Sequence, residues 1–148
     1  MNLTRHIGAE EAQILIESAA RKAEAMGVPQ NIAVVDGAGH LVAFRRMDGA
    51  KFMAIEIAIN KAFTAAGARR PTAAMGEAAQ PGSPGFGVNT QHYGRVTILA
   101  GGLPLTLPES GEVVGGIGIS SGSTAQDAEV AEAGLAAFLA HVAGLPGR

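Results

Sequence analysis

The chain has 148 residues, of which 47% are apolar and 21 are glycine, a composition that fits one ordered domain over residues 1–148 and excludes a disordered chain. Its formal net charge is −2 and it has no long basic run, which argues against binding to nucleic acid or to an anionic membrane surface. Charged residues make up only 16% of the chain, below the usual figure of about 25%. This low fraction indicates self-association into a homo-oligomer.

Two absences narrow the function further. The chain has no cysteine, which removes disulfides, thiol nucleophiles, thiolate zinc sites and iron–sulfur clusters. It has no run of about 18 apolar residues that would span a membrane, and its first residues include acids where a signal peptide needs an apolar core. We therefore predict a cytoplasmic protein without a membrane partner.

The first part of the chain predicts a helix followed by a hairpin. Apolar residues recur every three to four positions over Ala9–Met26, and Gly27 stands where a left-handed C-terminal cap belongs. The short apolar runs Asn31–Val35 and Leu41–Met47 flank a turn, Asp36–Gly39, whose glycines allow a tight reversal. These two runs are predicted to pair as strands.

The middle of the chain is predicted to be helical. Apolar spacing predicts a second amphipathic helix over Lys51–Ala66. A short third helix is expected after Pro71, before a long glycine- and proline-rich loop over Gln80–Gly94.

The last part predicts three strands and a helix. The strands are Val96–Leu99, Leu103–Leu107 and Val113–Ile119, and the turns between them are short enough for antiparallel neighbours. Ser123 and Gln126 form a capping-box pattern ahead of a final amphipathic helix. The element order is α-β-β-α-α-β-β-β-α, so we predict an α+β fold with a five-stranded, mostly antiparallel sheet packed by helices.

Several motifs along this order carry a family resemblance. They are Val34–Gly49, Lys61–Ala65, Arg70–Thr72, Gly101–Leu105, Gly115–Ser120 and Gln126–Asp127. In kind and spacing they resemble the GlcG/HbpS family of small haem-binding or haem-associated proteins, which is also similar to the C-terminal domain of PduO-type proteins. The resemblance implies profilin-like α/β/α layers, homo-oligomers that are octamers in some members, and haem as the cofactor. A shared fold does not by itself fix an activity.

The resemblance also points to Thr72. In the secreted haem sensor of the family, the haem ligand is a threonine in a block that resembles Arg70–Thr72, so that role would carry over to Thr72. The residue type allows a second interpretation, because a Thr that follows a helix-breaking Arg-Pro pair is a common N-cap of the next helix.

The four histidines are scattered along the chain, which argues against a helical metal pair and a dedicated zinc site. His92, in the predicted loop, and His6, before the first helix, are the better candidates for ligating haem iron or moving a proton. His40 and His141 fit structural roles in a strand and in a last helical turn. Ordinary loop positions remain the alternative for His92 and His6, since the sequence shows no partner for either.

The glycine-rich stretch Gly115–Ile119 and the serines after it form the most informative feature. Glycine weakens a strand interior, so these residues need a reason, such as a ligand that rests on the sheet at Gly116. The following helix N-terminus offers N–H groups near Ser121 and Ser123 to a carboxylate or phosphate. The alternative is that the glycines admit a helix or a second subunit, and that Ser123 acts only as a cap.

Three basic residues are further candidates for the site. Arg45 and Arg46 end a predicted strand and would hold the acid groups of a ligand, although strand alternation lets at most one of them face a given site. The alternative is two surface charges. Lys61 is a candidate proton carrier, or a residue whose stem covers a pocket.

These observations predict a homo-oligomer that binds haem, or another flat small molecule with acid groups, at a site between subunits. The two arginines and the N–H groups ahead of the final helix would hold the acids, and Thr72, His92 or His6 would approach the metal. The alternative is a catabolic enzyme, an isomerase, lyase or tautomerase that acts on an organic acid with His92 or Lys61 as proton carrier. A structural subunit of a larger assembly is a third hypothesis.

Overall fold

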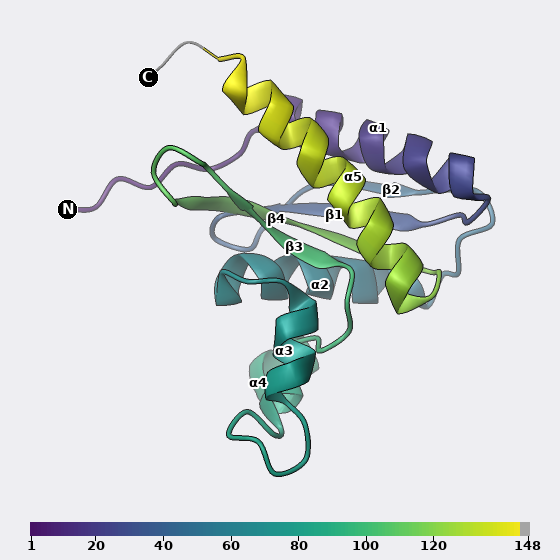
Figure 1. The fold of residues 1–148 in the computed structure, drawn as a ribbon, viewed down its shortest axis with the longest axis vertical. Helices are drawn as coiled ribbons and strands as arrows, with labels where there is room; N and C mark the ends of the chain where they lie inside the picture. The colour runs from purple at the N-terminus through teal and green to yellow at the C-terminus, as the bar shows by residue number, and fades with distance from the viewer. Residues whose placement is uncertain (146–148) are drawn as a thin grey trace.

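The computed structural model describes residues 1–145, and residues 146–148 of the predicted domain lie outside the described part. Its elements in chain order are α1 (Ala9–Met26), β1 (Asn31–Asp36), β2 (Leu41–Arg46), α2 (Ala54–Ala68), α3 (Thr72–Ala78), η1 (Val88–Thr90), α4 (Gln91–Gly94), β3 (Gly102–Thr106), β4 (Val113–Ser120) and α5 (Thr124–Ala143). An antiparallel sheet of four strands, in the order β2-β1-β4-β3, forms the middle layer (Figure 1). Helices α1 and α5 cover one face of the sheet and α2 covers the other, which gives α/β/α layers.

The α+β class and the antiparallel sheet are confirmed, but the prediction of five strands is wrong. The segment Val96–Leu99 forms no strand, and the element order has two strands after the helical part instead of three. The N–H of Thr97 donates to Oγ1 of Thr64 on α2, at 3.0 Å, and not to a neighbouring strand. Helix α3 also packs on this segment, because a Cβ at Gly76 would collide with the carbonyl of Ile98. Contacts to two helices thus replace a strand ladder.

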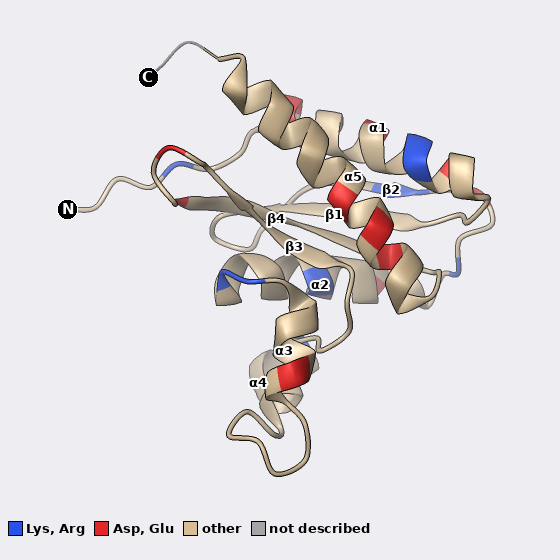
Figure 2. Ribbon diagram, in the orientation of Figure 1, with Lys and Arg blue, Asp and Glu red and all other residues tan. Residues whose placement is uncertain are grey.

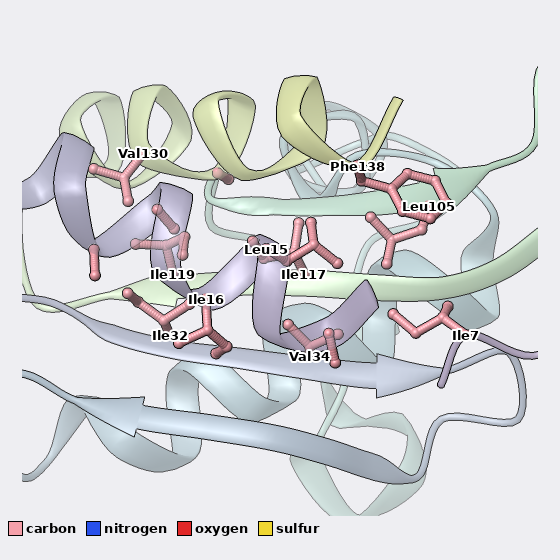
Figure 3. Packing of buried hydrophobic residues seen from close by; sticks show 14 of the residues in the cluster. Ile7, Leu15, Ile16, Ile32, Val34, Leu105, Ile117, Ile119, Val130 and Phe138 are labelled. Atoms are coloured by element: carbon pink, nitrogen blue, oxygen red, sulfur yellow. The ribbon is translucent and has the colours of Figure 1, made fainter. Parts of the chain in front are cut away.

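The larger core lies between the sheet and helices α1 and α5 (Figure 3). Because side chains alternate along a strand, Ile32 and Val34 of β1 point to this face together with Ile117 and Ile119 of β4. The two helices bring their apolar stripes to the same layer, with Leu15 and Ile16 from α1 and Val130 and Phe138 from α5. Truncating one such buried side chain to Ala costs about 2–5 kcal/mol, so this layer is a main source of stability.

The other face of the sheet is closed by small residues. Ala33 and Val35 of β1 pack against Ala58, Ala62 and Ala66 of α2, and all five are buried. The distance between packed elements depends on the side chains at the contact, and alanine lets the helix approach closely. The backbone of α2 therefore lies near the backbone of the sheet.

An arm formed by α3, η1 and α4 extends away from the layers (Figure 1). The predicted loop over Gln80–Gly94 lies in this arm and contains the two short helices η1 and α4. Phe86 and Tyr93 are exposed there, and Tyr93 is fully exposed to solvent, with a relative exposure of 106%. The arm thus presents aromatic surface away from the core.

The charged residues are distributed unevenly over the fold. Figure 2 shows Lys and Arg on several elements and loops, whereas acidic residues follow one another along the N-terminal half of α5. Lys22 of α1 pairs with Glu129 of α5 at 2.7 Å, and Arg5 of the N-terminal segment pairs with Glu112 at 2.8 Å. Within residues 1–145, no helix is both long enough and apolar enough to cross a bilayer.

Candidate functional site

Helix α2 lies directly on the glycines of β4. A Cβ at Gly116 would collide with the carbonyl of Ala62, and a Cβ at Gly118 with the carbonyl of Ala58. Glycine is therefore required for the close approach of helix and strand. This corrects the prediction for Gly116, because the space where we expected a ligand is filled by the protein's own helix.

The polar groups ahead of α5 are paired within the chain. Oγ of Ser123 accepts from the N–H of Gln126 at 3.2 Å, and the N–H of Ser123 donates to Oε1 of Gln126 at 2.9 Å, so the predicted capping box is confirmed. The N–H of Gly122 donates to Oδ1 of Asp127 at 3.0 Å. Oγ of Ser121 accepts from a backbone N–H ahead of α2 at 3.0 Å. Capping and loop closure therefore account for both serine hydroxyls.

Thr72 is fully buried as the first residue of α3. Its Oγ1 accepts from the N–H of Gly102 at 2.9 Å and donates to the carbonyl of the same residue at 3.5 Å. Pro71 takes the N-cap position and no side chain caps α3, so the alternative that Thr72 is an N-cap is wrong. The hydroxyl ties α3 to the start of β3, and the residue has no exposed surface through which a ligand could reach it.

Arg45 and Arg46 line an open groove of about 610 Å³ that also includes the C-terminal end of α1. In the antiparallel register they pair with adjacent residues of β1, so they alternate between the two faces of the sheet. Both nevertheless line this groove at the end of the strand, so the prediction that at most one of them faces a given site is wrong. Glu24 and Asp48 line the same groove. The lining thus includes two carboxylates and two guanidinium groups, whose formal charges sum to zero.

His6 and His92 lie at separate places in the molecule. His6 is exposed on the N-terminal segment, where Oγ1 of Thr4 lies 3.3 Å from its Nε2. His92 belongs to α4 in the arm, well away from that segment (Figure 1). In the part of the chain that the structure describes, no group of three or more His, Asp or Glu side chains is arranged to hold a metal ion. The two histidines thus do not converge on one site within this chain.

His92 instead meets Phe63 and Arg95 at the outer side of α2. The ring centroids of His92 and Phe63 are 5.4 Å apart with the planes at 72°, an edge-to-face contact. Cζ of Arg95 lies 3.8 Å from the centroid of the same Phe63 ring, a cation–π contact. Nε of Arg95 also donates to Oδ1 of Asn60 at 3.3 Å. An imidazole, an aromatic ring and a cation are therefore gathered here.

The backbone that carries His92 is strained. His92 (φ 51°, ψ 43°) and Tyr93 (φ 58°, ψ 35°) both adopt the left-handed conformation, and Gly94 follows with φ 81°. A non-glycine residue in this region costs on the order of 1–3 kcal/mol, and such residues cluster at functional sites. Buried Thr64 holds the end of the turn, because its Oγ1 donates to the carbonyl of Arg95 at 3.2 Å.

A groove of about 340 Å³ opens beside this cluster. It is lined by α2 and by the segment around the strained turn, through Ile57, Asn60, Asn89, Gly94, Val96, Thr97, Ile98 and Leu99. Asn60 both lines the groove and holds Arg95. The volume of about 340 Å³ lies near the lower end for ligand pockets, which run from about 300 to 1,000 Å³, so the groove of this chain would cover only part of a large flat ligand.

Lys61 lies on the inner side of α2 in a buried ion pair. Its Nζ donates to Oδ2 of Asp127 and to the carbonyl of Ile119, both at 2.8 Å, and only 1% of the residue is exposed. Oδ1 of Asp127 accepts from Nε2 of Gln30 at 3.0 Å. Burial lowers the pKa of Lys61, although the hydrogen bond and the charge of Asp127 raise it. The prediction of Lys61 as a proton carrier is therefore corrected, since the amine is sealed and joins α2 to β4 and α5.

The sequence singled out His92 but not the residues that gather around it. Phe63 lies within the helix predicted over Lys51–Ala66, but no motif in the sequence marks it, Arg95, Asn60 or Thr64 as a site residue. One signal was present, because Asn60 and Thr64 are two polar residues four positions apart in a largely apolar helix, which puts both on one face. No local pattern marks Arg95, whose partners lie far back in the chain on α2.

The chain and its fold are similar to those of several known proteins. A family model described as "Haem degrading protein HbpS-like" matches residues 7–136. Protein GlcG of Escherichia coli strain K12 is 34% identical over 109 residues, which cover 74% of this chain and 77% of GlcG. Corrinoid adenosyltransferase PduO of Citrobacter freundii is 35% identical over 129 residues, which cover 87% of this chain but only 38% of PduO.

A solved structure with a bound group has the same fold. It is the crystal structure of the PduOC:haem complex, which is similar with a TM-score of 0.85 and 30% identity. The similarity covers 89% of this chain and 94% of that chain.

Proposed function

The chain belongs to the HbpS-like family, and from this premise we propose that it is a cytoplasmic homo-oligomer that binds haem, or a related flat ligand with acid groups, between subunits. The predicted resemblance to the GlcG/HbpS family is confirmed by the family model and by the similarity to GlcG. The haem complex of PduOC, which shares the fold, supports haem as the ligand. We place the site at the groove between α2 and the strained turn formed by His92, Tyr93 and Gly94.

The residues around this groove fit a haem group. Haem iron accepts an imidazole as ligand, and exposed His92 stands in the chain between two residues that line the groove, Asn89 and Gly94. The apolar side chains of Ile57 and Val96 suit the face of a macrocycle. Bound haem supplies a redox-active iron, whose reactivity depends on its ligand and on the polarity of its surroundings. The role of this chain would be to ligate the iron and to exclude water from one face.

Exposed apolar side chains support a site between subunits. Met53 stands one helical turn before Ile57 and is 74% exposed, and the adjacent Phe52 is 76% exposed. Tyr93 projects fully into solvent from the strained turn. Exposed apolar area of this kind is typical of an interaction surface. A second copy of the chain would thus supply the other wall of a groove that is too small to enclose a macrocycle.

A haem titration into the purified protein tests this proposal. We expect a saturable shift of the Soret band, because His92 can ligate the iron. His92→Ala is expected to weaken binding by about tenfold or more, while His141→Ala, a half-exposed histidine at the end of α5, serves as the matched control. No shift, or a shift that survives the combined substitution of His92, His6 and Thr72, would contradict haem binding at these residues. A protein that sediments as a monomer with and without haem would contradict the site between subunits.

A further inference from the structure

Arg95 is fixed in position but has no acidic partner in residues 1–145. Its guanidinium lies over the ring of Phe63, with Cζ 3.8 Å from the centroid, and its Nε donates to Oδ1 of Asn60. The ion pairs in this part of the chain involve other basic residues, namely Arg5, Lys22, His40 and Lys61. Among the described hydrogen bonds, neither terminal nitrogen of Arg95 is a donor. A half-exposed cation is therefore held without a counter-charge.

The backbone below this guanidinium is held as well. Oγ1 of buried Thr64 donates to the carbonyl of Arg95 at 3.2 Å and accepts from the N–H of Thr97 at 3.0 Å. One helix side chain thus clamps the peptide on both sides of Val96. A group that is already ordered loses little conformational entropy on binding, so this arrangement favours a ligand over a mobile surface arginine.

The open groups of Arg95 have the geometry that carboxylates require. A guanidinium presents its N–H donors in a planar fork, which binds the two oxygens of a carboxylate side by side. The contact with Phe63 places Cζ over the ring, and the only described hydrogen bond of the guanidinium uses Nε, so both terminal nitrogens remain available to a ligand. Asn60 connects the group to a groove whose other walls are largely apolar. The matching ligand carries a carboxylate on an apolar, flat body.

We infer that Arg95, which lies beside this groove between its lining residues Gly94 and Val96, is the receptor for a ligand carboxylate, with Asn60 and Thr64 as positioning residues. Two sources offer the same chemistry: a propionate group of haem and a free organic acid. The haem source rests on the proposed function, whereas the free-acid source does not require it. The inference moves the acid-binding role from Arg45 and Arg46, whose groove contains its own carboxylates, to Arg95.

Benzoate and benzamide are suitable probes, because they share a flat apolar ring and differ in charge. Titration is followed by the NMR signals of the Arg95 Nε–H and of the Phe63 ring. We expect saturable shifts with benzoate and none with benzamide. Arg95→Gln should weaken benzoate binding by about tenfold or more, the loss expected for a charge-assisted pair. Arg95→Lys, which keeps the charge but not the fork, should be intermediate, and Arg21→Gln on α1 is the matched control.

Haem and haem with esterified propionates distinguish the two sources. If Arg95 binds a haem propionate, the Arg95→Gln variant should bind haem about tenfold more weakly than the wild-type protein does. The wild-type protein should then bind the esterified haem about as weakly as the variant binds unmodified haem. If Arg95 binds a free organic acid instead, benzoate affinity should fall in the Arg95→Gln variant, while haem affinity should be the same in the wild-type protein and in the variant. If the protein binds benzoate only when Arg95 is present and does not bind haem at all, the result supports Arg95 as a carboxylate receptor and contradicts the proposed function. The receptor is overturned if neither benzoate nor haem affinity changes in a folded Arg95→Gln variant, with folding checked by circular dichroism.

Discussion

The two sides of α2 hold their charged groups in opposite ways. On the inner side, Lys61 is 1% exposed and its Nζ lies 2.8 Å from Oδ2 of Asp127. On the outer side, Arg95 is half-exposed, stacked on Phe63 and without a carboxylate partner in the described residues. A buried charge requires a partner inside the protein because its desolvation is costly, whereas a half-exposed charge remains hydrated until a ligand arrives. The inner side is thus a structural joint and the outer side a candidate binding surface.

The largest effect is expected from Asp127→Ala. This change leaves the Lys61 ammonium buried without its counter-charge and also removes the acceptor of Gln30. Breaking a buried pair by removing one partner costs about 3–5 kcal/mol, and we expect that loss in the free energy of unfolding. Urea denaturation followed by circular dichroism measures it.

Two control variants test whether the loss comes from burial. Glu129→Ala removes the carboxylate of a surface pair with Lys22 and should cost less than about 1 kcal/mol. Arg95→Gln removes the charge on the outer side of α2 without breaking an ion pair; it loses the contact with Phe63 and one hydrogen bond at a half-exposed site, so it should cost no more than about 1–2 kcal/mol. If Asp127→Ala were no worse than these two variants, the inner pair would not be a joint and the contrast between the two sides would fail.

A second, smaller effect is expected from Gly118→Ala. The added Cβ would collide with the carbonyl of Ala58 on α2, and the helix must move away from the sheet. Overpacking of this kind typically costs about 1–3 kcal/mol, which thermal or urea unfolding would detect.

Gly67→Ala on α2 is the matched control for that substitution. A Cβ at Gly67 meets no other atom within 4 Å, and alanine is favoured over glycine inside a helix by about 1 kcal/mol. The two substitutions should therefore have opposite signs. If Gly118→Ala left the free energy of unfolding unchanged, α2 would not pack closely on these glycines. The space beside Gly116 could then hold a ligand, as the sequence predicted.

Much of the fold could be predicted because its signals are local. The apolar period over α1, the left-handed Gly27 after it and the capping box at Ser123 were all confirmed, since each depends on residues within a few positions. The segment Val96–Leu99 was predicted as a strand from its apolar side chains. Whether such a run pairs depends on a free sheet edge, and the N–H of Thr97 bonds to α2 instead.

The site was harder to predict because its contacts join distant parts of the chain. Arg95 depends on Asn60 and Phe63 of α2, and Lys61 on Asp127 of α5, none of which is a sequence neighbour. Residue type also misled the interpretation. A lysine on an amphipathic helix is usually at the surface, and a glycine-rich strand has the same sequence whether it admits a ligand or a helix.

The smallest effect is a dependence of stability on pH that arises from Lys61, on the inner side of α2. Burial lowers the pKa of Lys61 below its ordinary value of 10.5, against the opposing influence of Asp127. Between the lowered pKa and 10.5, the unfolded chain therefore binds more protons at this residue than the folded protein does. The free energy of unfolding must then rise with pH over that interval, and one pKa unit of lowering corresponds to about 1.4 kcal/mol.

The double variant Lys61→Met with Asp127→Leu provides the reference for this measurement, because it removes the titrating amine and its partner together. A well-packed apolar pair often replaces a buried ion pair without loss of stability, so the variant should fold. Urea unfolding of both proteins between about pH 8 and pH 10.5 should show a rise in the wild-type protein relative to the variant. A relative fall would mean that Asp127 outweighs burial and raises the pKa of Lys61. In that case the attraction between Lys61 and Asp127 would outweigh the cost of burying the Lys61 ammonium, and the pair would stabilise the folded protein.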